Sequence, residues 1–203
     1  MIKGVILGLV LAIIVAVGAG YFVITGGMLP ANADGQPGAF ESWAADASLQ
    51  ATLKREAPKV ANPIAATPEN FDSGLRLYAQ NCAICHGGGQ GSDSTASPIA
   101  KGEYPAPPQL AGDGVEDDPE GWTFWKIKHG IRLTGMPSWK NALDDKQIWT
   151  LTLFLKHMDK LPAPVDKAWK ALKTPDLAAL AGASAPAPAA PSPPAPSPTA
   201  TKP

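Results

Sequence analysis

The chain has few of the residues from which disulfide frameworks and multi-ligand metal sites are built. Its 203 residues include 2 cysteines and 3 histidines. Both cysteines lie in one short stretch, as Cys82 and Cys85. No thiol therefore remains for a disulfide elsewhere, for a four-cysteine zinc site or for an iron–sulfur cluster held by four cysteines.

A large excess of charge of one sign is also absent. Lysine and arginine number 17 and aspartate and glutamate 18, which gives a formal net charge of -1 at pH 7. No strongly basic face is implied, so the sequence argues against a nucleic-acid partner. Apolar residues crowd the N-terminus, and proline and alanine crowd the C-terminus. This leaves a globular part of about 100 residues, which is enough for one core.

The stretch Cys82-Ala83-Ile84-Cys85-His86 has the C-x-x-C-H form of a c-type haem attachment site. Two thiols at this spacing can each add to a haem vinyl group, and His86 would supply the proximal nitrogen to the iron. A thioredoxin-like motif would follow a strand in a βαβ unit, and a zinc site would need further ligands at finger-like spacing. His129 and His157 lie far downstream and not as a pair. We therefore predict one covalent haem c.

An uncharged, largely apolar run extends from Gly4 to Met28. It is long enough to cross a bilayer core, which needs roughly 20 apolar residues. Lys3 precedes it and acidic residues come first after it, so the positive-inside rule puts the N-terminus in the cytoplasm. We expect a single-pass anchor in the cytoplasmic membrane with the haem domain on the periplasmic, extracytoplasmic side. Ala31-Asn32-Ala33 has the form of a processing site, so a cleaved signal peptide is the alternative.

The sequence from Phe40 to Glu56 is compatible with a helix that has Phe40, Trp43 and Ala47 on one face. Pro58 ends it, and residues 58–68 form an extended linker. Two roles stay open for the helix. It either packs half-buried on the globular domain or lies on the membrane surface as a spacer.

A helix is predicted from Asn70 to Asn81, with Phe71, Leu75 and Tyr78 on one face. Gly74 inside this helix costs about 1 kcal/mol relative to alanine, which makes physical sense where a second helix crosses closely. The candidate for that second helix is the segment 144–158, whose aligned apolar residues are Ile148, Leu151, Leu155 and Met158.

The sequence between these two helices holds a Gly- and Ser-rich loop over 87–98, a proline-rich segment and a short helix over 121–130. In the segment Pro105–Leu110 a proline carbonyl is well placed to accept the free N–H of His86, which would fix the tautomer of this ligand. In the short helix, Trp122, Trp125 and Ile127 are the apolar candidates, and the two indoles are expected to pack in the core against the porphyrin.

Met136 stands between Gly135 and Pro137, in a loop with neither helical nor strand periodicity. A thioether is a soft ligand that suits haem iron, and His/Met ligation raises the reduction potential. Met1 and Met28 belong to the export segment, and Met158 fits the last helix. Met136 is therefore the candidate sixth ligand. A methionine that only fills a gap, or ligation by His129 or His157, is the alternative.

The C-x-x-C-H stretch, Pro107-Pro108-Gln109-Leu110, Thr134-Gly135-Met136-Pro137 and the closing aromatic helix at Trp149 resemble class I c-type cytochromes over about residues 68–160. The resemblance implies an all-α domain around one covalent haem c, ligated by His86 and Met136. It also implies that Pro108 and Leu110 support the haem on the histidine side. The N-terminal segment makes the chain similar to membrane-anchored bacterial monohaem cytochromes.

We accordingly divide the chain into a transmembrane anchor or signal segment (1–29), a membrane-proximal helix with a Pro-rich linker (30–67), a cytochrome c domain (68–162), a short helical extension (163–182) and a tail (183–203). The tail is nearly all Pro, Ala, Ser and Thr. It cannot bury enough apolar surface to offset its ordering entropy and is expected to be disordered.

His/Met ligation leaves no open site on the iron, so the expected function is one-electron transfer in a membrane-associated respiratory or related chain. Four cations near Met136 could steer an acidic redox partner: Lys126, Lys128, Arg132 and Lys140. One alternative is a cytochrome c subunit of a larger membrane oxidase or dehydrogenase complex, with the anchor and residues 40–57 as assembly surfaces. Another is a haem enzyme or gas sensor in which Met136 is displaceable.

Overall fold

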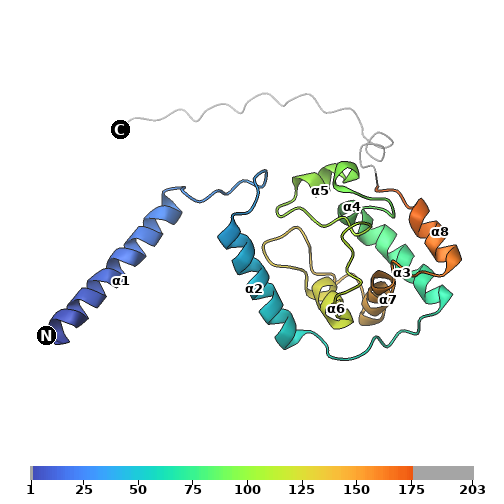
Figure 1. The fold of residues 1–203 in the computed structure, drawn as a ribbon, viewed down its shortest axis with the longest axis horizontal. Coiled ribbons are helices and arrows are strands. Elements are labelled where there is room, and N and C mark those ends of the chain that lie inside the picture. The colour runs from blue at the N-terminus through green and yellow to red at the C-terminus, as the bar shows by residue number, and fades with distance from the viewer. Residues whose placement is uncertain (1, 176–203) are drawn as a thin grey trace, which may run out of the picture.

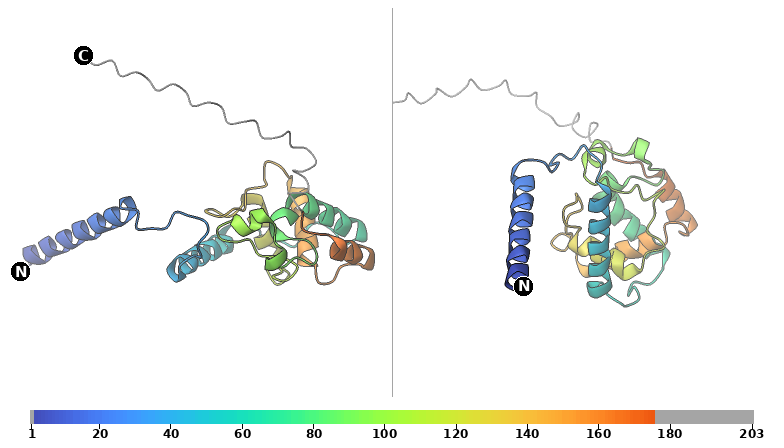
Figure 2. Two further views of the ribbon diagram at one scale, coloured as in Figure 1. Left: turned by 90° about the horizontal axis from the view of Figure 1, so that it is seen from above. Right: turned by 60° about the vertical axis from the view of Figure 1, so that its left-hand side comes forward.

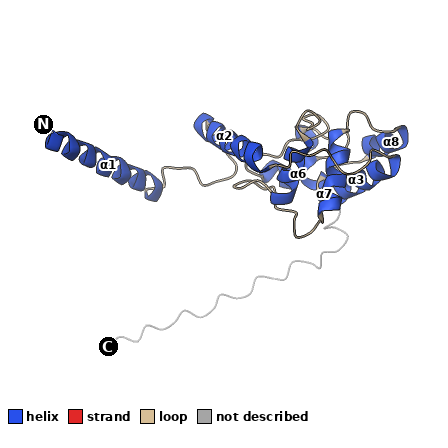
Figure 3. Ribbon diagram, turned by 90° about the horizontal axis from the view of Figure 1, so that it is seen from below, coloured by secondary structure: helices blue, strands red, loops and turns tan. Residues whose placement is uncertain are grey.

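The computed structural model describes residues 2–175, and within this range every regular element is helical (Figure 3). The predicted all-α class is confirmed. The tail expected over 183–203 lies outside the described residues. In chain order the elements are α1 (Ile2–Thr25), α2 (Ala39–Glu56), α3 (Pro68–Asn81), α4 (Ala83–His86), the 3-10 turn η1 (Asp93–Thr95), α5 (Pro98–Gly102), α6 (Glu120–His129), α7 (Asp145–Lys156) and α8 (Ala163–Ala171).

Helix α1 lies clear of the rest of the chain (Figures 1 and 2). It has 24 residues, none of them buried, and it is long and apolar enough to cross a membrane. An apolar helix that no protein surface covers would be unfavourable in water, whereas the hydrocarbon core of a bilayer can surround its apolar side chains. The predicted membrane anchor is therefore a regular helix over most of the expected segment.

Helices α3 and α7 cross at the centre of the globular domain (Figure 1). The hydroxyl of Thr67 caps α3, and Asp144 and Gln147 form a capping box at the start of α7. A Cβ added to Gly74 would lie 2.6 Å from Cβ of Phe154 and 2.7 Å from the carbonyl oxygen of Thr150. The predicted helix crossing at this glycine is confirmed, and its cause is the close approach of the two backbones.

The core around this crossing contains a cluster of three aromatic side chains. Tyr78 and Phe154 are fully buried. Trp169 of α8 meets both edge-on, with ring centroids 5.3 Å from Tyr78 and 5.6 Å from Phe154. Val165, one turn before Trp169, joins the same core. The hydrophobic core thus continues past residue 162, where the sequence led us to place the end of the domain.

Helix α2 forms where it was predicted, but the stripe of Phe40, Trp43 and Ala47 does not pack on the domain. Leu53 is buried, whereas Phe40 and Trp43 are 78% and 64% exposed. Ser42, Ala44, Leu49 and Thr52 are partly shielded. Of these, Ser42 and Leu49 share with Leu53 the face opposite to Phe40 and Ala47, so the domain packs on that face.

The segment that follows α2 is tied to the domain along its length. The carboxamide Nδ2 of Asn62 donates to Oε1 of Glu120 at 3.2 Å and to the carbonyl oxygen of Trp149 at 3.1 Å. The carbonyl of Pro58 passes so close to Gly121 that no side chain would fit there. The predicted linker is therefore irregular in conformation but fixed in place, and it holds α2 against the domain.

Candidate haem-binding site

A cavity with an almost wholly apolar lining opens beside the C-x-x-C-H stretch. The cavity proper has a volume of about 240 Å³ and continues through a mouth that is open to solvent. Its walls come from the end of α3, the C-x-x-C-H turn, the proline-rich segment, α6 and the loop after α6. The lining residues include Cys82, Cys85, His86, Glu103, Pro108, Leu110, Thr123, Ile127, Ile131, Met136 and Trp139.

One turn of helix places the three predicted attachment residues on this cavity. The backbone N–H groups of Cys85 and His86 both donate to the carbonyl oxygen of Cys82, at 3.1 and 2.9 Å. A tight turn of this kind brings residues three and four apart onto one side. Cys82, Cys85 and His86 all line the cavity.

The proline-rich segment runs directly under His86. Nδ1 of His86 lies 2.9 Å from the carbonyl oxygen of Pro108, and the N–H of Leu110 donates to the carbonyl oxygen of His86 at 3.1 Å. Since a carbonyl can only accept, Nδ1 carries the proton and Nε2 keeps its lone pair for a metal. The sequence predicted this contact, and it is present with Pro108 as the partner.

Tyr78 fastens the same turn from the core side. Its hydroxyl donates to the carbonyl oxygens of Gly87 at 2.7 Å and His86 at 3.1 Å. Burial, and to a smaller degree the neighbouring Cys82, raises the pKa of the Tyr78 phenol far above its usual range. Sequence reasoning had used Tyr78 only as an apolar position of α3. The sequence did contain a signal for this contact. Tyr78 precedes His86 by eight residues, in the last turns of the helix that leads into the C-x-x-C-H stretch.

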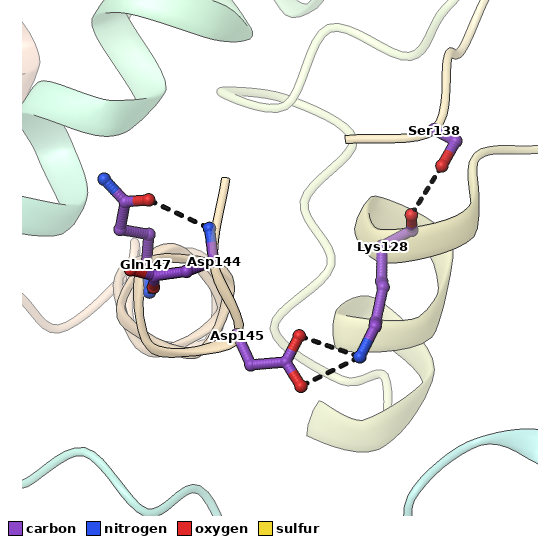
Figure 4. A network of polar contacts seen from close by, with 5 residues as sticks. All are labelled: Lys128, Ser138, Asp144, Asp145 and Gln147. Carbon is purple, nitrogen blue, oxygen red and sulfur yellow. Dashed lines mark hydrogen bonds and ion pairs between the residues drawn. The ribbon is translucent and has the colours of Figure 1, made fainter. Parts of the chain in front are cut away.

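Met136 lies half-buried on the cavity wall, in a loop that is fastened at several points. Its N–H donates to the hydroxyl of Thr134 at 3.1 Å, and its carbonyl accepts from the N–H of Ile131 at 3.2 Å. The hydroxyl of Ser138 donates to the carbonyl oxygen of Lys128 at 2.8 Å. Figure 4 shows this bond, and also the Lys128–Asp145 ion pair that joins α6 to α7.

Gly130 allows the Met136 loop to return against the end of α6. It has a φ of +68°, and an added Cβ would lie 2.7 Å from the carbonyl oxygen of Met136. Both the left-handed backbone and the close approach exclude other residues. Sequence reasoning ended a helix at this glycine but gave it no role. Its position directly after a helix and six residues before Met136 was the signal that could have indicated this role.

The two thiols do not have the properties of a redox-active or metal-binding pair. Burial raises the pKa of Cys82 to about 12. Burial and the hydrogen bond to Glu103, whose Oε1 lies 3.1 Å from the sulfur, raise the pKa of Cys85 to about 12. Reactive thiols of the thioredoxin type have lowered pKa values instead. Within residues 2–175 no cluster of three or more His, Cys, Asp and Glu could hold a metal ion.

Several other sequence-predicted contacts are not formed. Trp122 and Trp125 are half-buried and absent from the cavity wall, where Thr123 and Ile127 stand instead. The expectation that these indoles face the porphyrin is wrong, because α6 presents its Gly121, Thr123, Phe124 and Ile127 face inward. His129 is exposed and His157 contacts the carbonyl oxygen of Leu153. Neither histidine lines the cavity.

The residues present fit a haem c. An imidazole with a fixed tautomer, a thioether and two neighbouring thiols face one cavity whose remaining lining is largely hydrocarbon. Soft sulfur and imidazole nitrogen are the protein ligands that haem iron takes in electron-transfer proteins. The apolar lining would keep water from the group.

Comparison with known proteins gives one family and one curated relative. Residues 69–155 match the family described as cytochrome c oxidase, cbb3-type, subunit III. The cbb3-type cytochrome c oxidase subunit CcoP of Azospirillum brasilense is 30% identical over 88 residues, which are 43% of this chain and 28% of that protein. The similarity thus spans less than a third of that relative's length. No solved structure matches.

Proposed function

We propose that this membrane-anchored chain, whose residues 69–155 are a c-type cytochrome domain, carries single electrons through one covalent haem c as a subunit of a membrane redox complex. The observation that carries the proposal is the meeting of Cys82, Cys85, His86 and Met136 on one apolar cavity, with His86 held by Pro108. The similarity to a subunit of a cbb3-type oxidase supports an oxidase as the complex.

Each of these side chains has a definite role in the proposal. Cys82 and Cys85 would each add an S–H bond across a vinyl double bond, which forms a thioether without any oxidant. Nε2 of His86 and the sulfur of Met136 would hold the iron, while Pro108 and Leu110 support the histidine side. When bound, haem c supplies a one-electron ferric/ferrous couple whose potential depends on these ligands and on burial.

The polypeptide gives the site an apolar lining. Leu110, Ile127, Ile131 and Trp139 line the cavity, and Leu110 and Ile127 are nearly inaccessible to solvent. An apolar lining with both axial positions filled by side chains favours electron transfer to a docked protein over chemistry on a small molecule. Lys3 before α1 and the acidic residues that come first after it support the extracytoplasmic side for the haem domain.

The cations expected to steer a partner fall into two groups. Lys126 is paired with Asp118 at 2.6 Å and Lys128 with Asp145 at 2.7 Å. Arg132 and Lys140 are exposed and form no ion pair among residues 2–175. Leu133, beside Arg132, is 91% exposed. We therefore assign the docking contact to Arg132, Lys140 and Leu133, on the loop that carries Met136.

Carbon monoxide tests the proposed coordination directly. The reduced wild-type protein should keep its absorption spectrum under carbon monoxide, because Met136 occupies the sixth position. Met136→Ala should open that position, shift the spectrum under carbon monoxide and lower the reduction potential, since thioether ligation raises it. A shift in the wild-type spectrum would instead support a haem enzyme or a gas sensor.

A second experiment tests the assembly. Solubilisation of native membranes in mild detergent should release the chain together with oxidase subunits, and the complex should oxidise its haem on addition of oxygen. Release of the chain alone, with a spectrum unaffected by carbon monoxide, would leave it as an independent electron carrier.

A further inference from the structure

Helix α2 carries an apolar face that nothing in the described part of the chain covers. Phe40, Trp43, Ala47, Ala51 and Lys54 succeed one another at intervals of three or four, so they form one face, and all five are exposed. The rings of Phe40 and Trp43 contact each other, with centroids 5.6 Å apart. We call these five residues the outward face of α2, because Leu49 and Leu53 on the other side face the domain.

The composition of the outward face changes along the helix. The two aromatic rings lie in the first turns, nearest the segment 26–38 that leads back to α1. Two alanines follow, and Lys54 closes the row. Aromatic rings concentrate at the level of lipid headgroups, and a lysine beyond them can reach phosphate oxygens. This order suits a helix whose first turns meet the headgroup layer.

The acidic residues of α2 do not belong to this row of five. Glu41 lies beside the hydroxyl of Tyr104, and this contact raises the pKa of the Tyr104 phenol. Asp46 is three positions after Trp43 and one before Ala47, on the flank nearer the domain. No carboxylate therefore belongs to the row of outward residues, and headgroup contact requires none to be dehydrated.

The chain itself brings a bilayer within reach. α1 ends at Thr25 and α2 begins at Ala39, so the connecting segment spans at most about 45 Å when fully extended. Met28 and Leu29 at its start are both more than half exposed, which continues the apolar surface of α1 toward α2. A bilayer is the apolar surface to which this chain is already attached.

We propose that the outward face of α2, through Phe40 and Trp43, rests in the headgroup layer of the membrane that α1 spans. The contact is of the kind that aromatic side chains make at a membrane–water interface. Because Asn62, Pro58 and Leu53 fix α2 to the domain, the contact also orients the domain.

The orientation has a consequence for the haem site that rests on the proposed function. Tyr104, which meets Glu41 of α2, lies between Glu103 and Pro105, and both of these line the cavity. The cavity rim at Glu103–Pro105 would therefore lie within a helix diameter of the headgroups. A haem edge this close to the membrane surface suits electron exchange with a partner whose own redox centre also lies close to that surface.

Spin labelling of the full chain in phosphatidylcholine nanodiscs tests the contact. A nitroxide at Ala47→Cys reports on the outward face and leaves both aromatic rings in place. A nitroxide at Ala45→Cys is the matched control, because Ala45 is an equally exposed alanine of the same helix on a different side. The unsubstituted chain, labelled in the same way, corrects for any reaction at Cys82 or Cys85.

The readout is the ratio of nitroxide accessibility to oxygen, which partitions into lipid, and to a water-soluble nickel chelate. We expect a higher ratio at residue 47 than at residue 45, and loss of the difference when Phe40→Ser and Trp43→Ser are added. Equal, water-like ratios at both positions would overturn the proposal. A label at residue 47 shielded from both reagents would also overturn it, in favour of a protein surface. The membrane contact is measured without reference to haem, so its failure leaves the proposed function untouched.

Discussion

At the scale of single residues, Tyr78 connects the core to the C-x-x-C-H turn. It is fully buried against Phe154 and Trp169, and its hydroxyl satisfies two carbonyl oxygens of the turn at His86 and Gly87. Buried carbonyl groups that lose a donor retain the cost of their dehydration. Tyr78 therefore affects both the stability of the domain and the position of the histidine.

Tyr78→Phe should lower the free energy of unfolding by about 1–3 kcal/mol, because it removes both hydrogen bonds and keeps the ring. The pH dependence supplies a second readout. The folded protein holds the phenol neutral, since the pKa of Tyr78 is raised, whereas the unfolded chain releases this proton above about pH 10. The wild type should thus lose stability as the pH rises above that value. Urea titrations at neutral and alkaline pH measure both effects, and an alkaline slope unchanged in Tyr78→Phe would contradict the assignment.

Gly130 acts at the same scale on the loop that carries Met136. Gly130→Ala would place a Cβ 2.6 Å from the carbonyl carbon of Pro137 on a backbone of positive φ, so the Met136 loop must move outward. The reduced variant should then bind carbon monoxide in part, and its reduction potential should fall toward that of Met136→Ala. Gly102→Ala is the control, because an added Cβ there meets nothing within 4 Å. A wild-type spectrum in Gly130→Ala would show that this glycine does not position Met136.

At the scale of elements, the crossing of α3 and α7 determines whether the domain forms. Both helices begin with their own side-chain caps, so each is locally specified before they meet. Their contact then depends on the absence of a side chain at Gly74, where two backbones and Phe154 come together.

Gly74→Ala should separate these helices and cost about 1–3 kcal/mol or more, as overpacking does in a closely packed core. The penalty should exceed the gain in helix propensity, which is about 1 kcal/mol for alanine over glycine. Thermal unfolding followed by circular dichroism measures the difference, again with Gly102→Ala as the control. A more stable Gly74→Ala protein would mean that the crossing is looser than the structure indicates.

At the scale of the whole molecule, the anchor and the haem domain are connected by chain but share no packing. No residue of α1 is buried, and no described residue of the domain depends on it. α2 differs in this respect, because Leu53 and Ala57 are 2% and 6% exposed and belong to the folded unit.

Removal of residues 2–38 should therefore yield a water-soluble protein with the absorption spectrum and unfolding free energy of the full chain. Removal of residues 2–57 should be more costly, since it exposes the surface that Leu53 and Ala57 cover. Sedimentation after extraction without detergent, together with urea titration of both truncations, makes the comparison. Equal stability of the two truncations would show that α2 contributes nothing to the fold.

The sequence by itself determined the features that depend on local spacing. The C-x-x-C-H stretch places its three candidate haem-binding side chains within one helical turn, α1 follows from an unbroken apolar run, and Gly74 marks the helix crossing. Only the tertiary structure decided which faces are buried: Leu53 rather than Phe40 in α2, Thr123 and Ile127 rather than the indoles in α6, and the inclusion of Trp169 in the core. It also decided that Lys126 and Lys128 are neutralised by Asp118 and Asp145. Periodicity shows that a helix has an apolar side, but which side meets the core depends on neighbours that are distant in sequence.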